Sequence, residues 1–462
     1  MSDTSLLIRN AQAILTGLDG EAMRHDVARL GGDLRVRGSR IEAMGRLTPE
    51  PGERIIDATG SVVMPGWVNT HHHLFQSLLK GIPAGINLGL MGWLSAVPVS
   101  YRRHFDHDAV MRLAARLGMV ELLLSGCTTV ADHQYHYYPG MPFDASQAVF
   151  DEAAALGVRF VLCRGGQTIA RAIDVNPPPQ VQPETLEAFL AAVEHDVHRF
   201  HDPAPDALRR VVSAPTTPTW SVPVEHLRPI ADEARRLGIR LHSHLSETAD
   251  YIRYTQEVHG CSPVDFVEQH GWLGEDVWYA HLVHLSDSDL AKLARTGTGM
   301  AHCPQSNCRL GSGVAPAPAL HRAGGRVSLA VDGAASNEAA DMLHEAHTTW
   351  MVHRAVGGAD AITAEEVLYM GTAGGARVLG LDAVGTLQPG QAADLVILPL
   401  NEPRQWGLHD PAMAPVMSGA ARPSHVLCHG RVVVDQGEIP GLDLTALRAE
   451  AEAAVRVMQE AA

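Results

Sequence analysis

Residues 62–73 read VVMPGWVNTHHH, a mostly apolar run that ends in three histidines. The apolar part has the length and composition of a buried strand, which we expect over residues 62–70. Successive side chains along a strand point to opposite faces, so His71 and His73 share one face and His72 takes the other. Only two of these three histidines can therefore bind the same metal ion.

Further apolar runs follow this strand, and helix-like segments separate them. Residues 109–126 and 224–238 are two such helices, and each ends in a glycine suited to a left-handed cap. Strands that alternate with helices indicate a parallel sheet, and eight such units close into a (β/α)8 TIM barrel. The remaining seven expected strands are TTVADH (128–133), VRFVLCRG (158–165), RRVVSAP (209–215), IRLHSHL (239–245), VWYAHLV (277–283), GMAHCP (299–304) and VSLAVDG (327–333).

Both ends of the chain differ from this central part. Residues 4–60 and about 384–440 contain short β-like pieces separated by glycine turns. We therefore expect one small β-sandwich domain that both termini build, with the barrel inserted into it. Residues 444–462 predict an amphipathic helix that packs on the rest of the protein. The expected division is 1–61 for the first part of the small domain, 62–383 for the barrel and 384–462 for the second part with its helix.

The composition excludes several classes of partner. The formal net charge is −16, Lys80 and Lys292 are the only lysines, and no basic cluster exists, so we expect no nucleic-acid binding. The six cysteines form no C-x-x-C pair, which favours a reducing cytoplasm. The first residues lack a signal-peptide pattern and no run of eighteen apolar residues exists, so we expect neither export nor a membrane span.

Potential metal ligands gather where the expected strands end. TIM-barrel enzymes place their chemistry at the carboxyl ends of the strands. Here strand one ends in His71 and His73, strand five ends in His244, and strand eight ends in Asp332. Three imidazoles and one carboxylate are a normal ligand set for zinc or ferrous iron. The sequence therefore predicts one divalent metal ion, Zn²⁺ first and Fe²⁺ as the alternative, whereas His242 lies deeper in its strand and supports the ligands or the core.

The motifs PGWVNTHHH, HLSE, AH and VDGAASN, in this order and spacing, resemble the amidohydrolase superfamily, in its branch of cytosine/guanine-type deaminases and triazine hydrolases. The resemblance covers nearly the whole chain, including the split β domain. Members of that superfamily with two metals generally bridge them with a carboxylated lysine after strand four, but here that strand runs RRVVSAPTTP, which indicates a single metal. The resemblance implies His71, His73, His244 and Asp332 as ligands, with Glu247 and His281 in catalysis.

The expected chemistry is hydrolytic deamination. Asp332 has a free oxygen that can accept a proton from the attacking water. Glu247 can protonate a ring nitrogen of the substrate and then pass a proton to the departing amine, and His281 can hold the attacking oxygen. The alternatives are that Glu247 is an exposed loop carboxylate and that His281 is a hydrogen-bonding residue of the core.

The substrate is indicated less directly. The sequence resembles the 8-oxoguanine and isoxanthopterin deaminases in the motifs NTHHH, ELLLSGCTT, ADH, HCPQSN and VDGAASN. This resemblance implies that the substrate is an oxidised purine or a pterin. The loop from Lys80 to Ser100 differs from that of the 8-oxoguanine enzymes, which favours the pterin. Ordinary loop packing is the alternative for Gln76 and Trp93. Residues 176–183 form a rigid, extended loop that could line the pocket, but we expect a plain connector. The candidates are Gln76, Trp93 as a stacking ring, His133 (with Tyr135 or His136) as a donor to the substrate edge, and Arg164 for a carbonyl or carboxylate.

Two rival functions remain open at this stage. A triazine-type chlorohydrolase would use the same metal site and expel chloride instead of ammonia. A non-catalytic purine- or pterin-binding protein on this scaffold would normally have lost a ligand or the glutamate, and all of them remain here. In each case the partner is a small heterocyclic molecule, and a homo-oligomer is the expected assembly.

Overall fold

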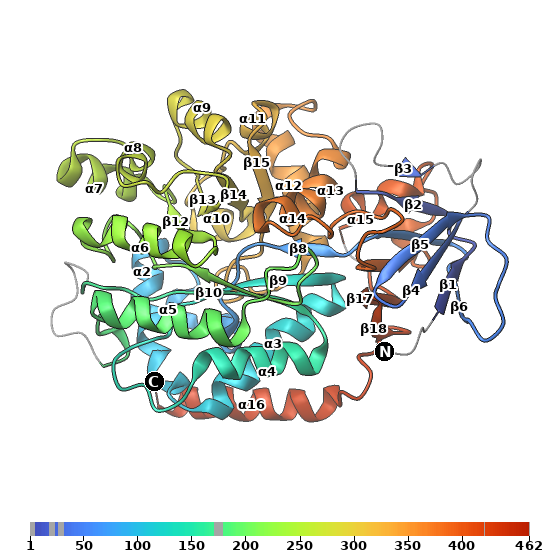
Figure 1. Cartoon of the computed structure of the whole chain (residues 1–462), viewed down its shortest axis with the longest axis horizontal. Coiled ribbons are helices and arrows are strands. Elements are labelled where there is room, and N and C mark those ends of the chain that lie inside the picture. The colour runs from blue at the N-terminus through green and yellow to red at the C-terminus, as the bar shows by residue number, and fades with distance from the viewer. Residues whose placement is uncertain (1–4, 18–23, 26–31, 171–178, 420, 462) are drawn as a thin grey trace.

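The computed structural model describes residues 5–17, 24–25, 32–170, 179–419 and 421–461. Its centre is a sheet of eight parallel strands, each paired with the next one along the chain, so the predicted barrel is confirmed (Figure 1). The barrel closes between its first and last strands, where Thr70 N donates to Leu329 O at 3.4 Å and Asp332 N donates to His71 O at 3.1 Å. The strands are β8 (Trp67–Asn69), β9 (Cys127–Gln134), β10 (Arg159–Arg164), β11 (Arg209–Ser213), β12 (Leu241–Leu245), β13 (Val277–His281), β14 (Gly299–His302) and β15 (Arg326–Leu329).

The strand predicted over residues 62–70 was wrong in one respect, because it is two strands in two sheets. β7 (Ser61–Pro65) pairs with β16 (Leu395–Pro399) of the small domain, and β8 enters the barrel. The chain crosses between them at Gly66, where a Cβ atom would lie 2.2 Å from Thr128 Oγ1. Only glycine permits this close approach. We therefore place the junction between the small domain and the barrel at Gly66.

The small domain consists of two further sheets to which both termini contribute (Figure 1). Apolar side chains from both sheets, Ile8 and Leu34 from one and Ile14, Val63 and Leu395 from the other, form one buried cluster, as expected for a β-sandwich. One sheet has the order β5 (Arg40–Gly45), β4 (Asp33–Arg37), β1 (Ser5–Arg9) and β6 (Arg54–Asp57). The other has the order β18 (Arg431–Asp435), β17 (His425–Cys428), β16, β7, β2 (Ala13–Leu15) and β3 (Arg24–His25).

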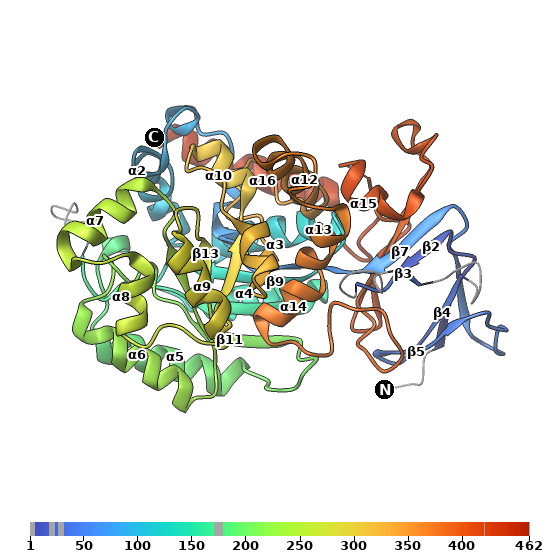
Figure 2. The ribbon, with the colours of Figure 1, turned by 90° about the horizontal axis from the view of Figure 1, so that it is seen from above.

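Helices surround the barrel, and the small domain lies at one side of it in both views (Figure 1, Figure 2). The helices predicted over residues 109–126, 224–238 and 444–462 correspond to α3, α6 and α16, and α16 packs against α3. Among the helices of the described residues, none combines the length and the apolar character that a membrane span requires. The helices are α2 (Leu90–Leu94), α3 (Asp108–Leu124), α4 (Ala145–Leu156), α5 (Leu186–Phe200), α6 (Val224–Arg236), α7 (Ala249–His259), α8 (Pro263–Gln269), α9 (Asp287–Thr296), α10 (Pro304–Leu310), α11 (Ala317–Arg322), α12 (Met342–Gly357), α13 (Ala364–Gly371), α14 (Ala373–Leu379), α15 (Ala414–Met417) and α16 (Leu444–Glu460).

Candidate active site

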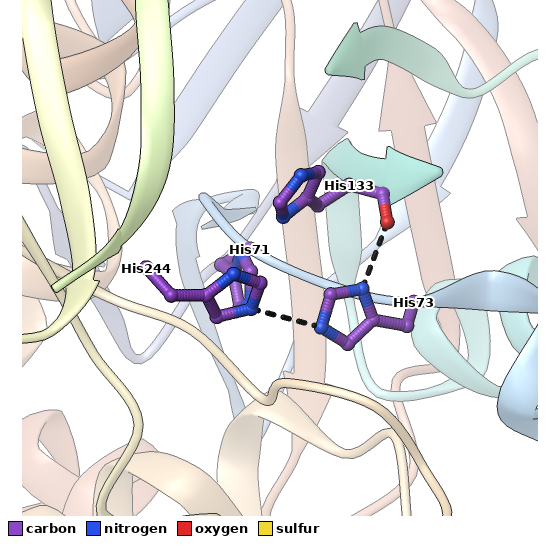
Figure 3. A group of neighbouring side chains, drawn as sticks. All are labelled: His71, His73, His133 and His244. Carbon is purple, nitrogen blue, oxygen red and sulfur yellow. Dashed lines mark hydrogen bonds between the residues drawn. The ribbon is translucent and has the colours of Figure 1, made fainter. Parts of the chain in front are cut away.

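The four predicted metal ligands meet at the carboxyl ends of the barrel strands. Asp332 Oδ1 lies 3.3 Å from Nε2 of His71 and 3.3 Å from Nε2 of His73. His73 Nε2 lies 3.3 Å from His244 Nε2 (Figure 3). Atoms that bind one zinc ion tetrahedrally at about 2.1 Å are separated by about 3.4 Å. The side chains close enough to hold a metal ion form two overlapping groups: His71, His73, His133 and His244 in one, and His71, His281 and Asp332 in the other. His72 points away from these groups, and its Nδ1 accepts from the backbone N–H of His73 at 2.7 Å.

A chain of hydrogen bonds fixes the tautomer of His71. His242 Nδ1 donates to the carbonyl oxygen of Trp278 at 3.0 Å, which leaves the Nε2 of His242 as an acceptor. His71 Nδ1 therefore donates to His242 Nε2 at 2.8 Å, and the lone pair of His71 lies on Nε2. His242 thus orients His71, a predicted ligand, as a ligand-orienting group does in metal sites.

The other two imidazoles are oriented in the same way by backbone carbonyls. His73 Nδ1 donates to His133 O at 2.8 Å, and His244 Nδ1 donates to Thr216 O at 2.7 Å. Each ring therefore presents an unprotonated Nε2 to the group. Burial lowers the pKa of His71 and His244 well below the usual value of 6.5, so both stay neutral. Metal ions bind the neutral form of histidine.

The carboxylate of Asp332 is ionised and held by two hydroxyl groups. Burial opposes its ionisation, but the neighbouring imidazoles of His71 and His73 hold the pKa of Asp332 well below its usual value. Its Oδ2 accepts from Ser306 Oγ at 2.6 Å and from Ser336 Oγ at 3.3 Å. Asp332 has a φ of 61°, a backbone conformation that non-glycine residues rarely adopt and that often occurs at functional sites. Its Oδ1 therefore faces the imidazoles while Oδ2 remains anchored.

Glu247 and His281 lie beside the ligand group. Glu247 is only 5% exposed, so it is not the solvent-exposed loop carboxylate that was the alternative. Its Oε2 lies 3.7 Å from His281 Nε2, and its Oε1 accepts from Ser312 Oγ at 3.5 Å. Burial raises the pKa of Glu247. A carboxyl group with a raised pKa keeps a proton that it can donate near neutral pH.

The comparisons with known proteins agree with this geometry. The family model described as the amidohydrolase family matches residues 62–433. The chain belongs to the amidohydrolase family. The resemblance found in the sequence motifs is therefore confirmed, and the chain is a hydrolase of this family.

Three relatives of this amidohydrolase are informative. It is 52% identical to an isoxanthopterin deaminase from an unknown prokaryotic organism, over 98% of this chain and 97% of the relative. It is 37% identical to an 8-oxoguanine deaminase of Pseudomonas aeruginosa, over 98% of both chains. The solved structure of atrazine chlorohydrolase from Arthrobacter aurescens, complexed with zinc, has a TM-score of 0.90 and 28% identity, over 97% of this chain and 100% of that one.

A pocket of about 970 Å³, a volume that includes open solvent at its mouth, leads to the predicted metal ligands of the amidohydrolase. Its floor contains His73, His244, Glu247, His281 and Asp332. A pocket with mostly apolar walls and a few converging polar groups is typical of a small-molecule site. The aromatic side chains of its walls are Trp93, Tyr135, Tyr137, Trp220 and Tyr251.

Three of the predicted substrate-binding candidates, Gln76, Trp93 and Tyr135, line this pocket. Trp93 is buried, and its indole N–H donates to Ala335 O at 3.2 Å, which fixes the ring. Gln76 donates from Nε2 to the hydroxyl of Tyr135 at 2.9 Å, and its buried Oε1 has no hydrogen-bond partner among the described residues. A Cβ atom at position 333 would lie 2.0 Å from that Oε1, so Gly333 makes room for it. Gln76 therefore lines the pocket, and its Oε1 is a buried acceptor beside Gly333.

The connector after strand β10 takes part in the pocket, contrary to the prediction. Val181 and Gln182 line the pocket, and Gln167 Nε2 donates to the carbonyl oxygen of Val181. Residues 176–178 of the same predicted loop lie outside the described residues. The proline-rich composition indicated a stiff segment, but it could not indicate which way the segment turns.

Arg164 does not contact the pocket, so its predicted role is corrected. Its guanidinium forms two hydrogen bonds with Glu184, at 2.6 and 2.7 Å, and its Cζ lies 4.1 Å from the ring centre of Tyr137. The charge is thus neutralised by Glu184, and Arg164 is absent from the lining of the pocket. The pocket instead contains Arg102, a buried cation that the sequence analysis missed and that donates from Nε to His136 Nδ1 at 3.2 Å.

His133 also differs from its predicted role. Its Nε2–H donates to the carbonyl oxygen of Ala214 at 2.7 Å, and the residue is absent from the pocket lining. It cannot donate a hydrogen bond to the edge of a substrate while that bond exists. Its ring lies instead beside those of His71, His73 and His244 (Figure 3).

The segment from Ser306 to Ser312 contacts all three proposed catalytic side chains. Ser306 donates to Asp332, His281 Nδ1 donates to Asn307 Oδ1 at 2.9 Å, and Ser312 donates to Glu247. Ser306 and Asn307 lie in helix α10, and Ser312 follows the glycine that caps the end of this helix. The motif HCPQSN was the only signal of this role in the sequence, and it did not reveal which side chain each residue touches.

Replacing Asn307 by alanine is expected to lower kcat by about 10–100-fold without changing the affinity for zinc, because His281 loses the acceptor that orients its ring. Replacing Asn307 by aspartate keeps an oxygen acceptor and is expected to restore most of the rate. Steady-state kinetics and metal analysis of both variants measure these effects. The variant Cys308→Ala, at an exposed neighbour in the same helix, is the control. A normal rate in Asn307→Ala would show that the ring of His281 needs no such support.

Proposed function

We propose that this amidohydrolase deaminates an amino-substituted fused N-heterocycle and releases ammonia, with an oxidised pterin such as isoxanthopterin as the first candidate and an 8-oxoguanine-like purine as the second. The observation that carries this proposal is the buried carboxyl group of Glu247, which lines an aromatic pocket beside side chains that could hold a metal ion. The 52% identity to an isoxanthopterin deaminase over nearly the full length supports the pterin.

The ligand group fits one divalent ion of the kind that imidazole and carboxylate ligands prefer. Zinc is our first candidate because a solved relative is complexed with zinc, and ferrous iron suits the same ligands. When bound, such an ion would lower the pKa of water to about 7 and so supply a nucleophile at neutral pH.

The side chains of this protein then carry out the proton transfers of the reaction. Asp332 accepts the proton of the attacking water, whose oxygen bonds to the ring carbon that carries the amino group. Glu247 gives its proton to the adjacent ring nitrogen, and His281 holds the attacking oxygen as charge develops on it. Glu247, now ionised, takes the proton of the new hydroxyl group and passes it to the leaving nitrogen, so that the carbon–nitrogen bond breaks and ammonia and a ring carbonyl result. The proton held by Asp332 then restores the acid form of Glu247.

The lysines support a site for a single ion. The chain contains only two lysines, Lys80 and Lys292, and neither lies at the end of β11, the fourth strand of the barrel. Lys80 pairs with Glu121 at 2.5 Å, and Lys292 pairs with Asp265. Neither lysine lines the pocket. A second ion bridged by a modified lysine therefore has no place in the proposed mechanism.

A release assay on the zinc-loaded enzyme tests the proposed function. Isoxanthopterin, 8-oxoguanine and atrazine are offered separately, and both ammonia and chloride are measured. We expect ammonia from isoxanthopterin at the highest kcat/KM and a slower release from 8-oxoguanine. Chloride release from atrazine without ammonia from either fused ring would favour the triazine-type chlorohydrolase that the zinc-bound relative represents. No product from any substrate, combined with tight binding of a fused ring, would favour a non-catalytic binding protein.

Replacing Gln76 by leucine is expected to raise KM for isoxanthopterin by about 10–100-fold, because a substrate N–H would then lie against an apolar group instead of the acceptor Oε1. The zinc content should not change, since Gln76 lies outside the ligand group. Initial rates over a range of substrate concentrations measure the effect. The variant Gln459→Leu, on the exposed face of α16, is the control. An unchanged KM would remove Gln76 from substrate recognition.

A further inference from the structure

His133 has an unused nitrogen that lies beside the metal-ligand group. The residue lies in strand β9 and is fully buried. Because its Nε2–H donates to Ala214 O at 2.7 Å, the lone pair of the neutral ring is on Nδ1. That Nδ1 is buried and has no hydrogen-bond partner in the described part of the chain. Burying an acceptor without a partner costs free energy, so we expect a group from outside the protein chain to bind this nitrogen.

The position of this nitrogen fits the same ion as the other imidazoles. His71, His73, His133 and His244 each offer one nitrogen, and these nitrogens lie within 4.8 Å of one another (Figure 3). The ring centre of His133 lies 4.8 Å from that of His244 and 5.5 Å from that of His73. Two atoms on opposite sides of one zinc ion are separated by about 4.2 Å. Shifts of a few tenths of an ångström therefore bring all four nitrogens to a common ion.

The backbone holds His133 in register with the ligands of strand β8. Its N–H donates to His72 O at 2.7 Å, and its carbonyl oxygen accepts from His73 Nδ1 at 2.8 Å. The residue is thus fixed on both sides to the histidine run. A side chain that served only for packing would not need this nitrogen to face three other imidazoles.

We propose that His133 is a further ligand of the ion, which it binds through Nδ1. The inference rests on the proposed function for the presence of the ion, and it extends the ligand set to four imidazoles and the carboxylate of Asp332. His133 then differs from His71, His73 and His244, which present Nε2. Imidazole nitrogen suits zinc and ferrous iron alike.

A crystal structure of the wild-type enzyme loaded with zinc tests this inference, with the ion located from its anomalous signal. We expect the distance from zinc to His133 Nδ1 to be about 2.0–2.3 Å, close to the distances to the other nitrogens. A zinc ion bound by His71, His73, His244 and Asp332 but more than about 3 Å from His133 Nδ1 overturns the inference and leaves the proposed function intact. The absence of any ion from the site overturns both.

A measurement of affinity gives a second test that does not depend on activity. The dissociation constant for zinc is determined by competition with a coloured chelator, for the wild type, for His133→Gln and for His353→Gln. His353 is a suitable control because it is also buried but lies in α12, where its Nε2 is 2.9 Å from His302 Nε2. We expect zinc to bind about 10–100-fold more weakly in His133→Gln and within twofold of the wild type in His353→Gln. Equal affinity in all three proteins overturns the inference, and if His133→Gln does not fold, the wild-type crystal structure decides.

Discussion

Replacing Glu247 by glutamine is expected to lower kcat by about 10³-fold while leaving the metal content unchanged. Glutamine keeps the size of the side chain and can still accept the hydrogen bond from Ser312. It has no acidic proton for the ring nitrogen of the substrate, however, and cannot pass one to the leaving amine. The raised pKa that burial gives to Glu247 has the direction required of an acid near neutral pH.

The experiment combines ammonia-release kinetics with metal analysis of the same protein sample. The variant Glu257→Gln, at an exposed position in α7, controls for the loss of one carboxylate. A kcat within a few-fold of the wild type would remove Glu247 from the mechanism. Loss of the metal together with the rate would instead make Glu247 part of the support of the ion.

Replacing Asp332 by asparagine is expected to lower the rate by about 10⁴-fold and to weaken metal binding as well. The residue has two proposed tasks, since Oδ1 faces His71 and His73 and the carboxylate also accepts the proton of the attacking water. An amide keeps the shape but carries no charge. The variant therefore differs from Glu247→Gln, in which only the proton transfer is lost.

The two effects are separated by measuring the rate of Asp332→Asn at increasing zinc concentrations. We expect the metal to rebind at high zinc while the rate stays low, because the proton acceptor is still missing. The variant Asp360→Asn, at an exposed site, is the control. Full recovery of the rate at high zinc would limit Asp332 to the role of a ligand.

The sequence predicted the barrel and the ligand group because both depend on short-range patterns. Strand alternation places His71 and His73 on one face, and the ends of parallel strands meet at one side of a barrel, so His244 and Asp332 had to lie near them. The split of the first strand was missed because it depends on a contact between Gly66 and Thr128, which lie far apart in the sequence.

The residues around the substrate pocket were harder to predict because their roles depend on partners. Arg164 ends a barrel strand, as a substrate-binding residue would, but Glu184 neutralises it. The sequence predicts His133 as a donor to the substrate, and only the contact with Ala214 O shows which of its nitrogens carries the proton. The supporting contacts of Ser306 and Asn307 likewise require knowing where α10 lies relative to β13 and the segment after β15.

Adding zinc in known amounts to the metal-free enzyme, while ammonia release from isoxanthopterin is measured, tests the central claim of a single-ion aminohydrolase most directly. The account predicts no ammonia without metal, a linear rise, and a plateau at one zinc ion per chain. Ammonia release that persists in the metal-free enzyme, or a plateau reached only at two ions per chain, would contradict it.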